Sequence, residues 1–177
     1  MAKKIYPGRV IALVGLMGAG KSCIGRRLAQ EIGWPFVDAD KEIEQAAGCS
    51  VADFFARHGE QAFREGERKV IERLLRDSPQ VLATGGGAFM DPTIRAMLKE
   101  RALTIWLRAD LPTLLKRVQR RNDRPLLQNC DPRQKLQQLM TLRYPVYAEA
   151  DITVDSLDGP AELTLAQVMV ALDAHAA

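Results

Sequence analysis

The residues with the clearest chemical purpose run from Gly15 to Ser22 and read Gly-Leu-Met-Gly-Ala-Gly-Lys-Ser. This run fits G-x-x-x-x-G-K-[ST], the pattern of a loop that cradles the phosphates of a nucleotide. Its glycines let backbone N–H groups turn inward and approach phosphate oxygens closely. Lys21 adds a mobile positive charge for the β- and γ-phosphates, and the Ser22 hydroxyl suits a bound Mg²⁺ ion. A glycine-rich turn with an incidental lysine is the plainer alternative.

Two carboxylates, Asp38 and Asp40, could support metal and hydroxyl chemistry. We expect residues 36–40 to form a strand, on which the i, i+2 spacing places both side chains on one face. In α/β sheets the ligand crevice lies beyond the carboxyl ends of the strands, so both carboxylates should lie beside the phosphate loop. Asp38 would then support Mg²⁺ and Asp40 would contact a substrate hydroxyl. The alternative for Asp40 is an N-cap of the following helix.

A further group of candidates comprises Arg64, Glu67 and the glycines at 85–87. Arg64 and Glu67 are three residues apart on a predicted helix, and periodicity alone leaves open whether they form a surface ion pair or part of a site. Three consecutive glycines directly after a buried strand indicate that the backbone approaches another group closely.

The densest positive patch of the chain lies at residues 116–124, where five of nine residues are basic. We interpret it as a mobile lid that delivers guanidinium groups to a triphosphate. A solvated helix face is one alternative. An RNA-binding arm is another, but no aromatic residues are interleaved with the basic ones.

The elements that must position these residues alternate between strands and helices. Val10–Val14 is a continuous apolar run, as expected of a buried parallel strand, and an amphipathic helix follows the phosphate loop. Residues 41–76 show helical patterns only. The predicted strands are 10–14, 36–40, 81–83, 103–107 and 151–155. This order predicts an α/β fold with a doubly wound, five-stranded parallel sheet flanked by helices, in a single domain.

Composition narrows the class of protein further. The net charge of +3 over 177 residues is too small to indicate nucleic-acid binding. Three widely separated cysteines show neither disulfide nor metal spacing, and two histidines lie in no cluster. No run approaches 18 apolar residues, and the first residues lack the apolar stretch of a signal peptide. We therefore expect a cytoplasmic protein with no membrane partner.

Taken together, six motifs resemble those of the shikimate kinase family, in its order and spacing over nearly the whole chain. They are G-L-M-G-A-G-K-S at 15–22, D-A-D at 38–40, G-E-Q-A-F-R-E-G-E at 59–67, G-G-G at 85–87, R-P-L-L at 124–127 and L-R-Y-P-V-Y at 142–147. The resemblance implies a fold like that of nucleoside monophosphate kinases. It divides the domain into a core (8–39, 78–115 and 132–177), a helical substrate-binding segment (about 40–76) and a lid (about 116–131). It also implies ATP-dependent phosphorylation of the 3-hydroxyl of shikimate, in the route to chorismate and the aromatic amino acids, by a protein expected to be a monomer.

The resemblance assigns roles on the nucleotide side. Ser22 would hold Mg²⁺, with Asp38 contributing through water. Lys21 and Arg124 would be catalytic. The nucleotide would contact Gly18, Ala19, Gly20, Lys21, Ser22, Cys23, Arg117 and Arg124.

At one of these nucleotide positions the chain differs from the family pattern, and at another more than one arginine fits the assignment. Cys23 stands where the family commonly has Thr, and its backbone N–H still serves the phosphates. Arg117 resembles the arginine that stacks on adenine, although Arg120 and Arg121 make this assignment ambiguous, and the loop at 155–160 would line the adenine.

On the acceptor side, the resemblance implies that Arg64 and Arg143 clamp the shikimate carboxylate and that Gly86 gives a backbone contact. Asp40 would bind the shikimate hydroxyls and could act as the catalytic base. Two other functions stay open: a related small-molecule kinase, such as one for gluconate, and a non-catalytic nucleotide-binding module that signals through its lid.

Overall fold

A parallel sheet forms the centre of the molecule, described here from a computed structural model over residues 9–77, 79–121, 127 and 129–176. Its strands lie in the order β2-β3-β1-β4-β5, and every neighbouring pair is parallel. The strands are β1 (Val10–Val14), β2 (Phe36–Asp38), β3 (Val81–Ala83), β4 (Ala102–Arg108) and β5 (Ile152–Asp155). The predicted five-stranded parallel α/β fold is confirmed.

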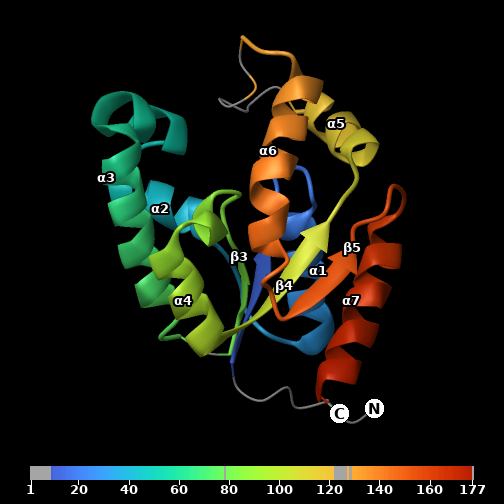
Figure 1. The fold of residues 1–177 in the computed structure, drawn as a ribbon. Coiled ribbons are helices and arrows are strands. Elements are labelled where there is room, and N and C mark those ends of the chain that lie inside the picture. Colours follow the sequence, from blue (N-terminus) through green and yellow to red (C-terminus); the bar gives the residue numbers. More distant parts are fainter. Residues whose placement is uncertain (1–8, 78, 122–126, 128, 177) are drawn as a thin grey trace.

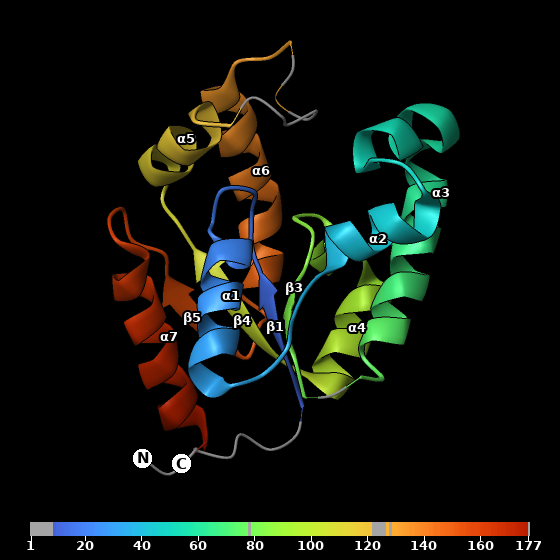
Figure 2. The same cartoon turned by 180° about the vertical axis from the view of Figure 1, so that it is seen from behind.

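Helices cover both faces of this sheet. They are α1 (Lys21–Ile32), α2 (Ala39–Ala47), α3 (Val51–Leu74), α4 (Pro92–Arg101), α5 (Leu111–Gln119), α6 (Pro132–Tyr147) and α7 (Ala161–Ala176), with a short 3₁₀ helix η1 (Ala88–Met90). In Figure 1, α4 and α6 lie in front of the strands. The reverse view in Figure 2 shows α1 and α7 side by side on the opposite face. No helix within the described part of the chain combines the length and the apolar character needed to cross a bilayer.

β1 lies at the centre of the sheet and is buried along its whole length. Its Ile11 is in register with Val81 of β3 on one side and Leu103 of β4 on the other. Because both neighbours are parallel to β1, the segments that follow the three strands emerge at the same edge. That edge carries the phosphate loop and the three glycines.

Local sequence signals set the helix boundaries. Asp91, Asp110 and Asp131 cap α4, α5 and α6 with their side chains, and each is followed by proline within the first turn of its helix. Proline suits that position because the first backbone N–H groups of a helix have no intrahelical partner. Gly33 and Gly48 end α1 and α2 in the left-handed conformation.

The helical segment between β2 and β3 consists of α2 and a long, interrupted α3. Gly59 adopts φ 81° and ψ 175° inside α3, a non-helical conformation that divides the helix into two parts. The ring of Phe63, after the break, packs against Phe54 and Phe55 before it, with centroid distances of 6.1 and 4.5 Å. These aromatic contacts hold the two parts of α3 together.

Candidate active site

The phosphate loop between β1 and α1 has a backbone that only glycine adopts readily. Gly15, Gly18 and Gly20 have φ of 146°, 82° and 94°. A Cβ on Gly15 would also lie 2.8 Å from the carbonyl oxygen of Leu107. The first turn of α1 has neither a side-chain cap nor an acidic residue, so its amide groups and its dipole favour an anion. The loop is therefore built to bind phosphate.

Lys21 lies at the first position of α1 and extends back across this loop. Its Nζ donates hydrogen bonds to the carbonyl oxygens of Gly15 (2.7 Å) and Leu16 (3.1 Å). The ammonium group is thus held within the loop, where its charge adds to that of the helix terminus.

Asp38 joins the phosphate loop to the start of α2. Its Oδ2 accepts a hydrogen bond of 3.0 Å from the hydroxyl of Ser22. Its Oδ1 accepts from the backbone N–H groups of Asp40 (3.1 Å) and Lys41 (3.4 Å), which makes Asp38 the N-cap of α2.

The expectation that Asp38 and Asp40 share one face of an extended strand was wrong. The strand ends at Asp38 and the helix begins at Ala39, because the Asp38 side chain satisfies two free N–H groups at the helix start. The capping alternative considered for Asp40 applies to Asp38 instead. Asp40, the last residue of the expected strand, lies instead in the first turn of α2.

Asp40 is a half-buried carboxylate among charged neighbours. Burial raises the pKa of Asp40, and the nearby carboxylate of Asp38 raises it further, while the charges of Lys21 and Arg64 act in the opposite direction. A raised pKa weakens the preference of this group for the ionised form and makes it a better proton acceptor once ionised.

The three glycines after β3 allow candidate side chains to approach the backbone. A Cβ on Gly85 would lie 2.7 Å from Oδ1 of Asp40, and one on Gly87 would lie 2.4 Å from Nη2 of Arg64. A Cβ on Gly86 would lie 3.6 Å from Nη1 of Arg143. The close approach predicted from the glycine run is confirmed, and it gathers one carboxylate and two guanidinium groups around a single backbone segment.

Arg64 is held in place by a buried partner. Its Nη1 donates to Oε2 of Glu67 at 2.6 Å, and Glu67 is only 1% exposed. Burial raises the pKa of Glu67, which the charge and the hydrogen bond of Arg64 oppose. The alternative of a surface ion pair is therefore wrong, because one partner of the pair lies in the interior.

Arg117 in α5 connects the phosphate loop with the loop after β5. Its Nη1 donates to the carbonyl oxygen of Gly18 (3.0 Å) and to Oγ of Ser156 (2.9 Å), and its Nη2 donates to the carbonyl oxygen of Leu157 (2.6 Å). Ser156 is 5% exposed and donates in turn to the carbonyl oxygen of Ala19 at 2.7 Å. Ser156 belongs to the loop at 155–160 that was expected to line the adenine, but nothing in the sequence singled it out within that loop.

The other two arginines considered for the adenine contact, Arg120 and Arg121, are exposed. Arg124 lies outside the described residues, as does much of the predicted lid. Arg117 instead contacts Ser156 and Leu157 in the loop at 155–160.

Oxygen ligands of the site fit a magnesium ion that shares its coordination with a nucleotide. Within the part of the chain that the structure describes, no group of three or more His, Cys, Asp or Glu residues could hold a metal by itself. The Ser22 hydroxyl and the Asp38 carboxylate form a smaller set of hard oxygen donors. Mg²⁺ in such sites takes one or two protein oxygens and completes its shell with phosphate and water.

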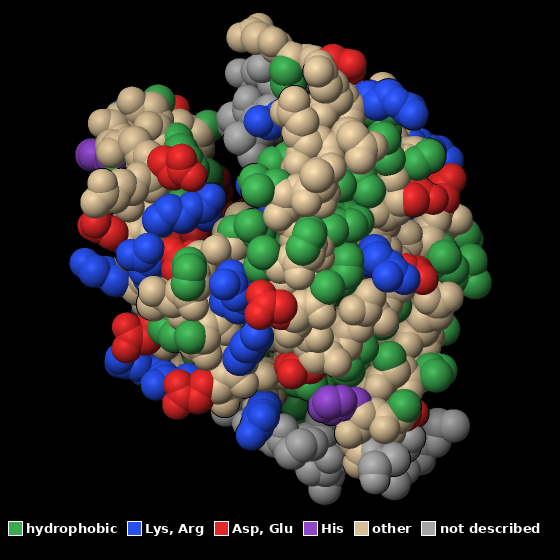
Figure 3. Space-filling model, in the orientation of Figure 1, with side chains coloured by type: hydrophobic (Ala, Val, Ile, Leu, Met, Phe, Trp, Pro, Cys, Tyr) green, Lys and Arg blue, Asp and Glu red, His purple; other side chains and the backbone are tan. Residues whose placement is uncertain are grey.

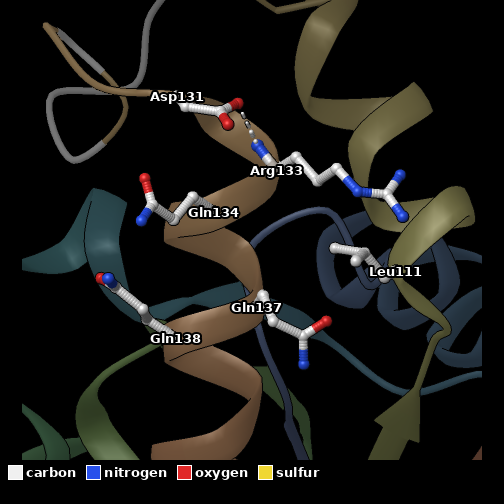
Figure 4. A pocket seen from close by; sticks show the side chains of 6 residues that line it. All are labelled: Leu111, Asp131, Arg133, Gln134, Gln137 and Gln138. Atoms are coloured by element: carbon white, nitrogen blue, oxygen red, sulfur yellow. Dashed lines mark hydrogen bonds between the residues drawn. The ribbon is translucent and has the colours of Figure 1, made fainter.

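In the space-filling view, a recess separates the lobe of α2 and α3 from the side of α6 (Figure 3). A distinct pocket lies against the first half of α6 and contains none of the candidate site residues (Figure 4). It is lined by Leu111, Asp131, Arg133, Gln134, Gln137 and Gln138.

Comparison with known proteins agrees with this geometry. A family model for shikimate kinase matches residues 17–173. The shikimate kinase of Paramagnetospirillum magneticum is 61% identical over 165 residues, which span 93% of this chain and 85% of that protein. The shikimate kinase of Caulobacter vibrioides is 51% identical over 169 residues, or 95% and 84% of the two chains.

Solved structures give the same result. The shikimate kinase of Acinetobacter baumannii in complex with shikimate superposes with a TM-score of 0.90 at 38% identity, over 94% of each chain. A gluconokinase from Sinorhizobium meliloti, over 98% of this chain and 95% of its own, reaches a TM-score of 0.62 at 22% identity, a likeness of fold alone. The chain belongs to the shikimate kinase family.

Proposed function

We propose that this protein transfers the γ-phosphoryl group of ATP to the 3-hydroxyl of shikimate, forming ADP and shikimate 3-phosphate. The proposal rests on two groups of residues that lie side by side at one edge of the sheet. A loop built to bind phosphate lies beside a cluster in which Asp40, Arg64 and Arg143 surround the glycines at 85–87. Phosphoryl transfer depends mainly on positioning and charge neutralisation, and this edge supplies both.

On the nucleotide side, the backbone of residues 18–23 and the Lys21 ammonium group hold the phosphates. Ser22 and Asp38, whose side-chain oxygens lie 3.0 Å apart, would hold Mg²⁺, with Asp38 contributing through water. When bound, the ion would supply charge neutralisation at the phosphate oxygens. Arg117 lies between the phosphate loop and residues 156 and 157, where it would contact the adenine, and Arg124 is the second basic residue we assign to the phosphates.

On the acceptor side, Arg64 and Arg143 bind the planar carboxylate of shikimate, and the backbone of Gly86 adds a contact. A guanidinium fork pairs with a carboxylate through two parallel hydrogen bonds, which fixes orientation as well as charge. Glu67 keeps Arg64 in place through its buried hydrogen bond. The clamp orients the ring so that one hydroxyl faces the phosphate loop.

Asp40 binds that hydroxyl and accepts its proton. The carboxylate is placed by the first turn of α2 and by its close approach to Gly85. Its raised pKa brings it closer to the pH at which the enzyme operates, and a general base is most effective there.

We further propose that the protein acts as a cytoplasmic monomer of one domain, with segments 40–76 and 116–131 as its substrate-binding and lid regions. Nucleic acids and membranes are not expected partners.

The arginine clamp provides a test of this proposal. Arg64→Lys and Arg143→Lys keep the positive charge and lose the fork. Each should lower kcat/KM for shikimate, with a loss of transition-state stabilisation of about 1.5–3 kcal/mol. ATP affinity, measured by direct binding without shikimate, should stay unchanged. Loss of ATP affinity in these variants would assign the arginines to the nucleotide site and overturn the proposed clamp.

A further inference from the structure

The last two turns of α6 carry a buried tyrosine beside one of the clamp arginines. Arg143 and Tyr147 are four residues apart and therefore lie on one face of the helix. Tyr147 is fully buried, and its ring packs against Phe89 and Trp106 with centroid distances of 6.4 and 5.9 Å. These contacts fix the ring, so the hydroxyl group has a defined position.

That hydroxyl contacts both parts of the proposed carboxylate site. It donates a hydrogen bond to the carbonyl oxygen of Gly86, which lies 61 residues away in sequence. Burial raises the pKa of Tyr147, while the charge of the neighbouring Arg143 guanidinium group and its hydrogen-bonding contact with the hydroxyl lower it. A phenol can make both contacts at once because it has one donor hydrogen and two lone pairs.

The hydrogen bond to Gly86 orients the neighbouring N–H group as well as the carbonyl group. The peptide between Gly86 and Gly87 is planar, so holding its C=O also sets the direction of the Gly87 N–H. Glycine segments have the most conformational freedom of any backbone, and three in succession need an external contact to hold one geometry.

We propose that Tyr147 is a positioning residue for the acceptor substrate, whose hydroxyl holds Arg143 and the glycine segment in the geometry that receives the carboxylate. The inference rests on the proposed function, because it takes the carboxylate site to be the one formed by Arg143 and Gly86. The protonated hydroxyl is the active form, because only it can donate to the carbonyl oxygen of Gly86.

Tyr144 offers a matched control on the same helix. Its ring lies 4.9 Å from that of Trp106, and its hydroxyl donates to the carbonyl oxygen of Ala109, outside the glycine segment. Burial raises the pKa of Tyr144 to about 12. Tyr144→Phe therefore removes the same chemical group and the same kind of hydrogen bond without touching the carboxylate site.

The first measurement compares Tyr147→Phe with Tyr144→Phe in steady-state kinetics. Tyr147→Phe should raise KM for shikimate by roughly three- to tenfold, the effect of one lost hydrogen bond, and leave KM for ATP within about twofold. Tyr144→Phe should leave KM for shikimate within the same twofold limit. Equal values of KM for shikimate in the two variants would overturn the inference.

A second measurement separates positioning from general destabilisation. The substrate is a shikimate analogue in which a hydroxymethyl group replaces the carboxylate, so that Arg143 has no anion to bind. Tyr147→Phe should then change kcat/KM by less than about twofold relative to the wild type, because the lost alignment no longer matters. An equal loss with both substrates would indicate a structural role and contradict the proposal.

Arg143→Lys distinguishes this inference from the function on which it rests. If Arg143→Lys does not affect KM for shikimate, the proposed carboxylate site is wrong and the inference falls with it. If Arg143→Lys raises KM and Tyr147→Phe does not, only the role of Tyr147 is wrong.

Discussion

At the scale of single residues, the fold influences the charge state of the Asp40 carboxylate. Burial and the Asp38 carboxylate raise its pKa above the ordinary value of 3.8. Folding therefore favours the protonated form of Asp40, and the ionised form needed for catalysis is held at a cost in stability. That cost is present at pH values above the raised pKa and vanishes below the ordinary value.

Asp40→Asn should accordingly separate stability from activity. At pH 7 the variant should unfold at a higher temperature than the wild type, since the disfavoured charge is gone, and the gain should disappear as the pH falls below 3.8. Its kcat should drop by roughly 10²- to 10⁴-fold, the usual contribution of a general base, with a smaller change in KM for shikimate. Thermal unfolding and initial rates on one preparation measure both effects.

The exposed residue Asp53 provides the control for that experiment. Asp53→Asn removes a carboxylate of the same size from the surface of α3 and should leave kcat unchanged. A wild-type kcat in Asp40→Asn would exclude Asp40 as a catalytic residue.

Gly87 shows how the absence of a side chain can serve binding. Its φ of −95° and ψ of −7° are readily adopted by alanine, so a methyl group there causes no backbone strain. The methyl group would instead lie 2.4 Å from the end of the Arg64 side chain, which must move away. The conflict therefore affects the clamp rather than the fold.

Gly87→Ala should keep the free energy of unfolding within about 1 kcal/mol of the wild type, because alanine also lowers the entropy of the unfolded chain. KM for shikimate should rise roughly tenfold as Arg64 is displaced. Gly66 in α3 has open space at its Cβ position, so Gly66→Ala should stabilise the protein by about 0.5–1 kcal/mol with unchanged kinetics. Normal binding of shikimate by Gly87→Ala would show that this approach to Arg64 is unimportant.

At the scale of elements, a hydrogen-bonded link ties three segments together around the nucleotide site. Arg117 from α5 and Ser156 from the end of β5 both contact carbonyl groups of the phosphate loop. The Ser156 hydroxyl is both donor and acceptor in this link, which a methyl group cannot replace. We expect the link to hold the phosphate loop against the loop that follows β5.

Ser156→Ala should therefore raise KM for ATP by roughly three- to tenfold, with KM for shikimate nearly unchanged. Ser50 is the comparison, because its hydroxyl caps α3 far along the chain from the phosphate loop. Ser50→Ala should lower the free energy of unfolding by about 1 kcal/mol and leave KM for ATP alone. Equal KM values for ATP in the two variants would mean that the link does not influence nucleotide binding.

At the scale of the whole molecule, the parallel sheet explains why distant motifs form one site. β1, β2 and β3 are neighbours with a common direction, so the segments after them meet at one edge. The phosphate loop follows β1, Asp38 is the last residue of β2, and the three glycines follow β3 after Thr84. The strand order and the helices between the strands are therefore sufficient to bring the parts of a two-substrate site together.

The fold could be predicted from sequence because its signals are local. The apolar run of β1, the Asp and Pro residues at helix starts and the glycines at helix ends each act within a few residues. Where two local signals competed, prediction failed. Residues 36–40 have the pattern of a strand, but the capping hydrogen bonds of Asp38 begin α2 two residues earlier.

In the candidate site, only residues that belong to a recognisable sequence motif could be predicted. Tyr147 and Ser156 act through hydrogen bonds to residues 61 and 137 positions away, and no periodicity or spacing indicates such pairs. The glycine run indicated that other groups approach the backbone closely, but it did not indicate which groups these are. Burial of Glu67 likewise depends on packing between elements, so the sequence left the nature of its pair with Arg64 open.

We propose that this edge of the sheet binds ATP and shikimate together and that phosphate is transferred between them there. The most direct test is coupled ADP release by the purified protein with Mg²⁺ and ATP, given shikimate, quinate or gluconate in parallel. We predict rapid ADP release with shikimate only, a product phosphorylated at the 3-hydroxyl, and near-complete loss of turnover in Lys21→Met with the fold intact. Equal or faster turnover of gluconate, or no ADP release with any acceptor, would contradict the account.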